Sequence, residues 1–68
     1  MLENEIHVFR ARKKLTQQQL ADQIGVSRQT IAAMEKNKYN PSLILAFKVA
    51  NALDVPITTI FNYKEENK

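Results

Sequence analysis

The 68-residue sequence contains no cysteine and no tryptophan, and it has only one histidine and one glycine. Without cysteine the chain forms no disulfide and offers no thiolate to a metal ion. One histidine without a set of acidic residues beside it does not make a metal site, so we expect no metal and no cofactor. A single glycine excludes a glycine-rich phosphate loop. Nothing in the sequence indicates catalysis, and we expect neither an enzyme nor a small-molecule ligand.

Long apolar runs are also missing. No stretch approaches the ~20 apolar residues that a membrane-spanning helix needs, so we expect no membrane partner. The N-terminal residues MLENEIH begin acidic and lack the apolar core of a secretory signal. These features predict an unprocessed cytoplasmic protein. Hydrophobic residues make up 44% of the chain, which is enough for one modest core, so residues 1–68 are expected to form a single domain.

The positive charge of the chain is unevenly distributed. The formal net charge is +3, but eight Lys or Arg residues lie between Arg10 and Lys48 against only Asp22 and Glu35. Both flanking segments are acidic on balance. A concentrated positive charge attracts a polyanion and speeds its encounter with the protein. The alternative from charge alone is the solvated surface of a mildly basic protein.

Capping residues and apolar spacing predict an all-α domain. The five expected helices cover about residues 4–14, 17–24, 28–37, 43–54 and 57–62. Thr16 and Gln19 have the spacing of a capping box, and Ser27 and Ser42 are typical N-caps. Gly25 is placed to end the second helix, because glycine readily adopts the left-handed backbone that a tight helix exit requires.

Apolar residues on one side of each helix predict the core. In the second to fourth helices these are Leu20, Ala21, Ile24, Ile31, Met34, Leu43, Ala46, Phe47, Val49, Ala50 and Leu53. Five apolar residues remain as surplus, and exposed apolar patches commonly mark interfaces. We therefore expect Ile44, Val55, Ile57, Phe61 and Tyr63 to form a dimer interface.

The two ends of the chain allow two interpretations. Aromatic and polar side chains alternate in residues 61–64, which is typical of a short strand. This strand would pair with residues 1–3 in a two-stranded ribbon. The simpler alternative is a frayed end, and we expect residues 64–68 to be a flexible tail.

Residues 17–36 have the pattern of a helix–turn–helix, with Gly25 between the two helices. A glycine between two helices is common in all-α domains. Here, however, the positions of the apolar residues before and after Gly25 are more closely constrained than a simple turn between helices requires. The second helix begins with Arg28 and Gln29, and its apolar residues lie on the opposite side. Arg and Gln form paired hydrogen bonds with guanine or adenine edges. The pattern therefore indicates sequence-specific DNA binding, with this helix in the major groove.

The segment LTQQQLADQIGVSRQTIAAMEKNKYNPSL resembles the lambda repressor and Cro family of helix–turn–helix regulators, the Xre type. The resemblance extends over roughly residues 4–61. It implies a compact five-helix fold, dimeric binding to an operator and, usually, repression of transcription. Short regulators of this kind that are similar to the cytolysin repressor also carry a ribbon after the helices.

The resemblance implies a role for particular residues. Arg28 and Gln29 fall at the main base-reading positions, and Ala32 and Ala33 face the same groove, although the family often has a longer polar side chain in place of Ala33. Expected contacts with the DNA backbone come from Gln17, Gln18, Ser27, Thr30, Lys36, Lys38, Tyr39 and Asn40. For the two lysines the alternative is ordinary solvation, and Tyr39 could instead cover a hydrophobic edge.

Arg10 and Glu35 lie on helix faces that are directed inward. Charged residues are rarely placed there unless they are paired. The resemblance implies a structural salt bridge between them that ties the first helix to the third.

Taken together, the sequence predicts a homodimeric repressor that binds a near-palindromic, double-stranded DNA operator. Two alternatives stay open. One is an antitoxin that uses the same domain on its own promoter, which would need a toxin-binding extension. The other is a protein-interaction module that acts on another regulator through its surplus apolar surface.

Overall fold

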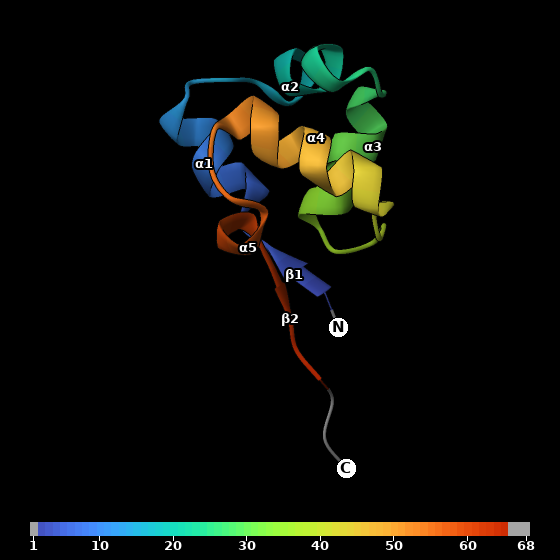
Figure 1. Ribbon diagram of the computed structural model, residues 1–68. Helices are drawn as coiled ribbons and strands as arrows, with labels where there is room; N and C mark the ends of the chain where they lie inside the picture. The colour runs from blue at the N-terminus through green and yellow to red at the C-terminus, as the bar shows by residue number, and fades with distance from the viewer. Residues whose placement is uncertain (1, 66–68) are drawn as a thin grey trace.

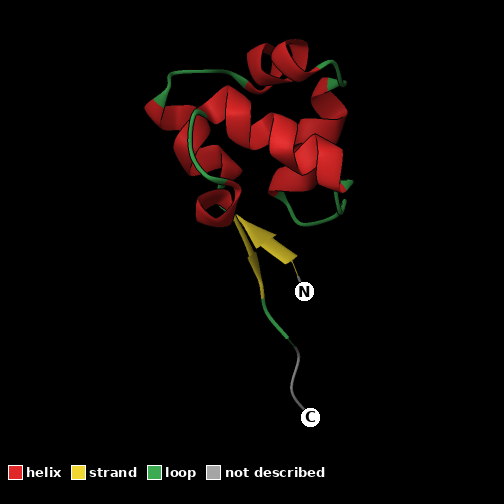
Figure 2. Ribbon diagram, viewed as in Figure 1, coloured by secondary structure: helices red, strands yellow, loops and turns green. Residues whose placement is uncertain are grey.

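The computed structural model describes residues 2–65, and its helices and strands are shown in Figure 2. Five helices are bracketed by two short strands. In chain order the elements are β1 (Leu2–Asn4), α1 (Ile6–Arg12), α2 (Gln17–Ile24), α3 (Arg28–Glu35), α4 (Leu43–Leu53), α5 (Ile57–Ile60) and β2 (Phe61–Tyr63). This is the five-helix architecture with a short two-stranded ribbon that the sequence predicts.

The fourth helix is the centre of the bundle. α4 contacts α1, α2 and α5, whereas α3 packs mainly against α2. The two strands extend away from the helices on one side of the molecule (Figure 1). α3 is therefore connected to the bundle mainly through α2, and its first turn, with Arg28 and Gln29, is exposed to solvent.

The core consists only of apolar side chains. Its buried members are Ile6, Leu20, Ala21, Ile24, Ile31, Met34, Leu45, Ala46, Val49, Ala50, Leu53 and Ile60. Phe9, Leu15 and Val26 pack against its edge and are half-buried. Within residues 2–65 no polar or charged residue belongs to the buried class. Because burial of apolar area stabilises a fold by roughly 25 cal/mol per Å², contacts among these residues hold the helices together.

The ribbon pairs the two ends of the domain. β1 and β2 are antiparallel, with Leu2 opposite Tyr63 and Asn4 opposite Phe61. The hydrogen bond from Glu5 N to Ile60 O (2.9 Å) continues this pairing to the start of α1. The predicted strand pair is therefore present and the frayed-end alternative is wrong for residues 61–63. β1 is displaced by one residue from the expected 1–3, and β2 begins at Phe61 as expected but ends one residue earlier, at Tyr63. Met1 lies outside the described residues.

Several predicted helix bounds are corrected. Asn4 belongs to β1, so α1 begins only at Ile6, and α3 ends at Glu35 rather than near residue 37. The fifth helix stops at Ile60 because Phe61 adopts an extended backbone (φ −108°, ψ 136°) and enters β2. Lys64 and Glu65 are exposed and lie outside any helix or strand, and the rest of the predicted tail lies outside the described residues.

The orientation of α4 also differs from the prediction. Leu43 and Phe47 were expected in the core, but they are 70% and 48% exposed, whereas Leu45 is buried. The sequence LILAFKVANAL is apolar almost all round, so periodicity does not decide which side faces inward. Packing against α1, α2 and α5 determines which side of α4 faces inward.

Among residues 2–65 the longest helix is α4, and none of the helices has the length and apolar character needed to cross a bilayer.

Candidate nucleic-acid interface

The corner between α2 and α3 is built by local hydrogen bonds. Thr16 and Gln19 form the predicted capping box, in which Thr16 Oγ1 accepts from Gln19 N (3.0 Å) and Gln19 Oε1 accepts from Thr16 N (2.8 Å). Gly25 ends α2 in the left-handed conformation (φ 78°), and its N–H donates to Ala21 O (2.9 Å). Ser27 caps α3 by accepting from Thr30 N (3.1 Å). The capping box thus fixes the start of α2, and the bonds of Gly25 and Ser27 fix where α2 ends and α3 begins.

The third helix has a buried side and an exposed side. Ile31 and Met34 have no exposed surface and anchor it to the core. Arg28 and Gln29 occupy its first turn and are exposed, whereas Ala32 is half-buried. Among residues 2–65, Arg28 has no ion-pair partner. The helix therefore offers a guanidinium and a carboxamide to the solvent with their hydrogen-bonding groups available.

The next turn of the exposed side is shallow. Ala33 is half-buried like Ala32. Because both side chains are only methyl groups, little projects from the helix surface between Gln29 and Lys36. A flat strip of this kind allows a groove wall to approach the helix closely, or a thymine methyl to contact alanine.

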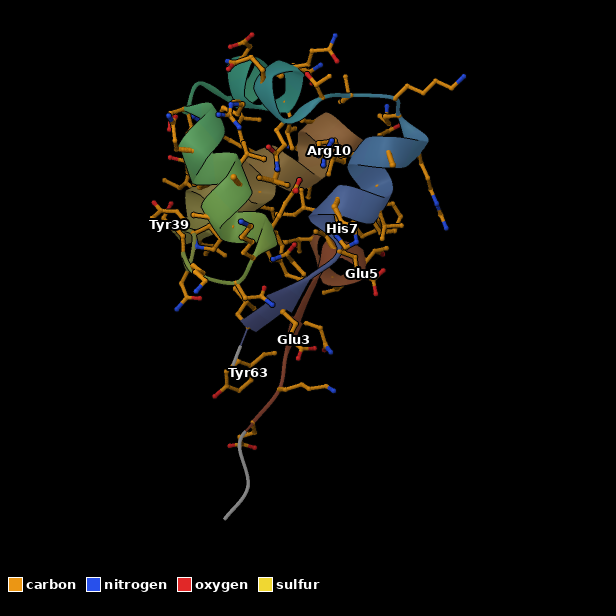
Figure 3. All side chains as sticks on the ribbon, turned by 180° about the vertical axis from the view of Figure 1, so that it is seen from behind. Glu3, Glu5, His7, Arg10, Tyr39 and Tyr63 are labelled. Atoms are coloured by element: carbon orange, nitrogen blue, oxygen red, sulfur yellow. The ribbon has the colours of Figure 1, made fainter. Side chains whose placement is uncertain are left out.

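A network of charged and polar side chains lies behind α3. Arg10 points from α1 toward α3 (Figure 3), and its Nε donates to Glu35 Oε2 at 2.8 Å. The side chains of this pair are 19% and 9% exposed, respectively. Gln17 Nε2, at the start of α2, donates to Glu35 Oε1 at 3.0 Å. The last residue of α3 is thus bound to both α1 and α2.

The side chains expected to contact phosphates are not all free. Gln17 is engaged with Glu35, and Gln18 Nε2 donates to Asp22 Oδ1 at 2.8 Å. The hydroxyls of Ser27 and Thr30 lie 3.0 Å apart and bond to each other. Because a carboxamide has two N–H hydrogens and a hydroxyl both donates and accepts, each group retains capacity for a further hydrogen bond.

The loop between α3 and α4 carries the remaining predicted residues. Lys36, Lys38, Tyr39 and Asn40 are all exposed, and Tyr39 lies at the outer edge of this loop (Figure 3). Lys38 N donates to Ala33 O at 2.9 Å. This bond folds the loop back on the end of α3, so the two lysines lie close to the exposed side of that helix.

Sequence reasoning missed the role of Asn4. Its Nδ2 donates to Met34 O (2.6 Å) and to Asn37 Oδ1 (2.9 Å), which connects β1 to the end of α3. The only signal in the sequence is that asparagine is a common cap residue. Its partners lie 30 and 33 positions away, and no local pattern indicates them.

Two helices joined by a short turn, with the polar first turn of the second helix exposed, are typical of helix–turn–helix DNA-binding domains. A helix-turn-helix family model matches residues 6–60. The chain therefore belongs to the helix–turn–helix family, of the Xre type.

Curated relatives and a solved structure agree with this assignment. The chain is 51% identical over 65 residues to an uncharacterized HTH-type transcriptional regulator, MJ0272, from Methanocaldococcus jannaschii, covering 96% of this chain and 98% of that protein. It is 42% identical over 55 residues to the immunity repressor protein of Bacillus phage phi105, covering 81% of this chain but 38% of the repressor. The crystal structure of a protein from Bacteroides fragilis is 40% identical and has a TM-score of 0.83, with 91% of this chain and 100% of that one covered.

The family and the relatives are DNA-binding transcriptional regulators rather than enzymes. The protein is accordingly a transcriptional regulator with a DNA-binding helix–turn–helix.

Proposed function

We propose that the protein is a homodimeric repressor that binds a near-palindromic operator in the cytoplasm and blocks transcription. The observation that carries the proposal is the exposed first turn of α3. Arg28 and Gln29 project outward there, while Ile31 and Met34 anchor the opposite side of the helix in the core. A helix held in this way enters the major groove with its N-terminal residues against base edges.

In this proposal Arg28 and Gln29 read bases. Arginine pairs with the O6 and N7 atoms of guanine, and glutamine pairs with adenine, each through two hydrogen bonds. Ala32 and Ala33 contribute close approach and contact with thymine methyl groups. Each well-formed base contact discriminates against the wrong base by about 1–3 kcal/mol, so one domain reads only a few base pairs.

The surrounding polar groups bind phosphates. Lys36, Lys38, Tyr39 and Asn40 are exposed on the loop that folds against α3. On the other side, the start of α2 offers backbone N–H groups and a favourable helix dipole to a phosphate. Gln17 and Gln18 each retain one amide hydrogen for the same phosphate, and Ser27 and Thr30 retain hydroxyl capacity. These contacts fix the position of the domain on the duplex without reading sequence.

The dimer forms through exposed apolar side chains. Of the five residues expected there, Ile44 and Tyr63 are 71% and 67% exposed. Val55, Ile57 and Phe61 are half-buried and pack against the core, so they offer less surface to a second copy. Leu43 and Phe47 join Ile44 on the outer side of α4. We therefore propose that a second copy contacts α4 at Leu43, Ile44 and Phe47, with Tyr63 extending the contact.

Two domains are needed because a single recognition helix makes few base contacts. A two-fold dimer places the two α3 helices in successive major grooves about 34 Å apart. Occupation of a promoter by such a dimer blocks access of the polymerase. The name of the phage relative, an immunity repressor, supports repression rather than activation.

Selection from a pool of randomised duplex DNA tests the proposal. The purified protein should select one symmetric motif, and it should sediment as a dimer with that duplex. Addition of the protein to a purified transcription reaction should reduce transcript from a promoter that contains the motif but not from a scrambled control. Recovery of no motif would favour a protein-interaction module and contradict the proposal. A motif that increases transcription when bound would contradict repression alone.

A further inference from the structure

Within residues 2–65, Asn4 is the ribbon side chain that hydrogen-bonds to the end of the recognition helix. Asn4, the last residue of β1, donates one amide hydrogen to the carbonyl of Met34 and the other to Asn37 Oδ1. Its own Oδ1 accepts the N–H of Ile6 (3.0 Å), the first residue of α1. Both hydrogens and the oxygen of this carboxamide are therefore engaged.

The acceptors of Asn4 lie at the C-terminal end of α3. Met34 is in the last turn of the helix, and its carbonyl also accepts from Asn37 N (3.0 Å). Asn37 has a left-handed backbone (φ 60°) and reverses the chain just after the helix. The carbonyls of a last helical turn have no partner within the helix. For Met34 the N–H of Asn37 is one such partner, and Asn4 supplies a second from a different part of the chain.

A rigid helix turns as a unit, so a movement of one end also moves the other. Arg28 and Gln29 lie at the first two positions of α3, about 9 Å and about 7.5 Å along the axis from Met34 at 1.5 Å per residue. A small rotation of the C-terminal end therefore displaces the base-reading end. Packing against α2 and the bonds of Glu35 to Arg10 and Gln17 hold α3 from one side, and Asn4 adds a restraint from the ribbon side.

We propose that Asn4 is a positioning residue for DNA recognition, which holds α3 at the angle that aligns Arg28 and Gln29 with base edges. This inference rests on the proposed function. It makes the ribbon, formed from the two ends of the domain, part of the recognition machinery although it carries no base-reading side chain.

The test compares Asn4→Asp with Asn62→Asp. Aspartate at position 4 keeps the oxygen that caps α1 but loses the donors to Met34 in α3 and to Asn37 just after it. Asn62 lies in β2, is exposed, and makes no side-chain hydrogen bond within residues 2–65. The control therefore adds the same charge to the same ribbon without touching α3.

The readout is sequence discrimination, measured as the ratio of Kd for a scrambled duplex to Kd for the duplex that wild-type protein selects. It is measured at a temperature at which circular dichroism shows each variant to be folded. Asn4→Asp should lower this ratio about tenfold, the loss expected when one paired base contact is misaligned. Its affinity for the scrambled duplex and the salt dependence of that affinity should match those of Asn62→Asp.

Four outcomes are decisive. A tenfold loss in Asn4→Asp and not in Asn62→Asp supports the proposal. An unchanged ratio with only a lower Tm shows that Asn4 is merely structural and overturns it. If Asn4→Asp does not fold, Asn37→Gly is the deciding variant, since glycine suits the left-handed backbone there and the change removes one acceptor of Asn4. Asn37→Gly should lower the discrimination ratio roughly threefold. An unchanged ratio in this variant overturns the proposal. A wild-type protein that selects no motif overturns both this inference and the proposed function.

Discussion

Arg10 and Glu35 lie 25 positions apart in the chain and form an ion pair with 2.8 Å between Nε and Oε2. Arg10 also donates to the carbonyl of Leu15 (2.9 Å), and Glu35 also accepts from Gln17 (3.0 Å). One carboxylate thus connects α3 to α1 and α2, directly behind the helix that we propose enters the groove. Charged groups that are mostly removed from water stabilise a fold only while each keeps its partners.

Replacement of Glu35 by Ala should lower the free energy of unfolding by about 2–4 kcal/mol, because it leaves the guanidinium of Arg10 partly buried without its counter-ion. Urea denaturation of Glu35→Ala, of Arg10→Met and of the double variant Arg10→Met/Glu35→Ala measures the effect. The double variant should lose less than the sum of the single losses. Additive losses would show that the two side chains do not stabilise each other.

Gly25→Ala should destabilise the protein by about 1–2 kcal/mol, the cost of a left-handed backbone with a Cβ atom. A Cβ atom added to Gly25 meets no other atom within 4 Å, so the cost comes from the backbone alone. Thermal denaturation measures it. Gly25→Asn should cost less, because asparagine tolerates this conformation better than alanine does. Equal losses in the two variants would contradict a purely conformational origin.

Arg28→Ala should weaken binding to the selected operator by about 1–3 kcal/mol and relax the preference at one base pair in each half-site. The free energy of unfolding should change by no more than about 0.5 kcal/mol, because Arg28 is exposed. Binding to a set of single-base operator variants measures both the affinity and the preference. A footprint and affinity identical to those of the wild type would remove Arg28 from the base-reading residues.

Lys38→Ala should weaken binding to all duplexes alike. If Lys38 neutralises one phosphate, the slope of log Kobs against log salt concentration should fall by about 1 per domain. Titrations at four salt concentrations measure the slope. Lys48, which is exposed on α4, provides the matched control, and Lys48→Ala should leave the slope much closer to the wild-type value. Equal slopes for the two variants would exclude a specific phosphate contact of Lys38.

Ile44→Glu should shift the protein from dimer to monomer, because it places two like charges across the proposed two-fold contact and removes apolar surface from it. Sedimentation velocity over a range of protein concentrations measures the change. Gln23 is an exposed residue of α2, and Gln23→Glu is the control that should leave the dimer intact. A dimer that survives Ile44→Glu unchanged would place the interface elsewhere on the molecule.

The caps and the corner could be predicted from the sequence because their causes are local. A hydroxyl three residues before a backbone N–H forms the same bond in almost any surroundings, so Thr16, Ser27 and Ser42 cap their helices as expected. Gly25 ends α2 for an equally local reason. The amphipathic pattern of α3 was also sufficient to place Ile31 and Met34 inside and Arg28 outside.

The orientation of α4 could not be predicted in the same way. Apolar residues occupy nearly every side of this helix, so hydrophobicity gives no single inward direction. Packing against the neighbouring helices buries Leu45 and exposes Leu43 and Phe47. The apolar surface available to a second copy therefore follows from the tertiary structure and was only partly anticipated.

The sequence by itself determined where α2, α3 and α4 begin, where α2 ends and which side of α3 faces inward, because these depend on neighbours within a few residues. Only the tertiary structure decided that the chain ends pair as a ribbon and that Asn4 holds the end of α3. It also decided which apolar residues of α4 remain exposed. Those features depend on contacts between residues about 30 or more positions apart or between packed helices, and such contacts form only when the bundle closes around its core.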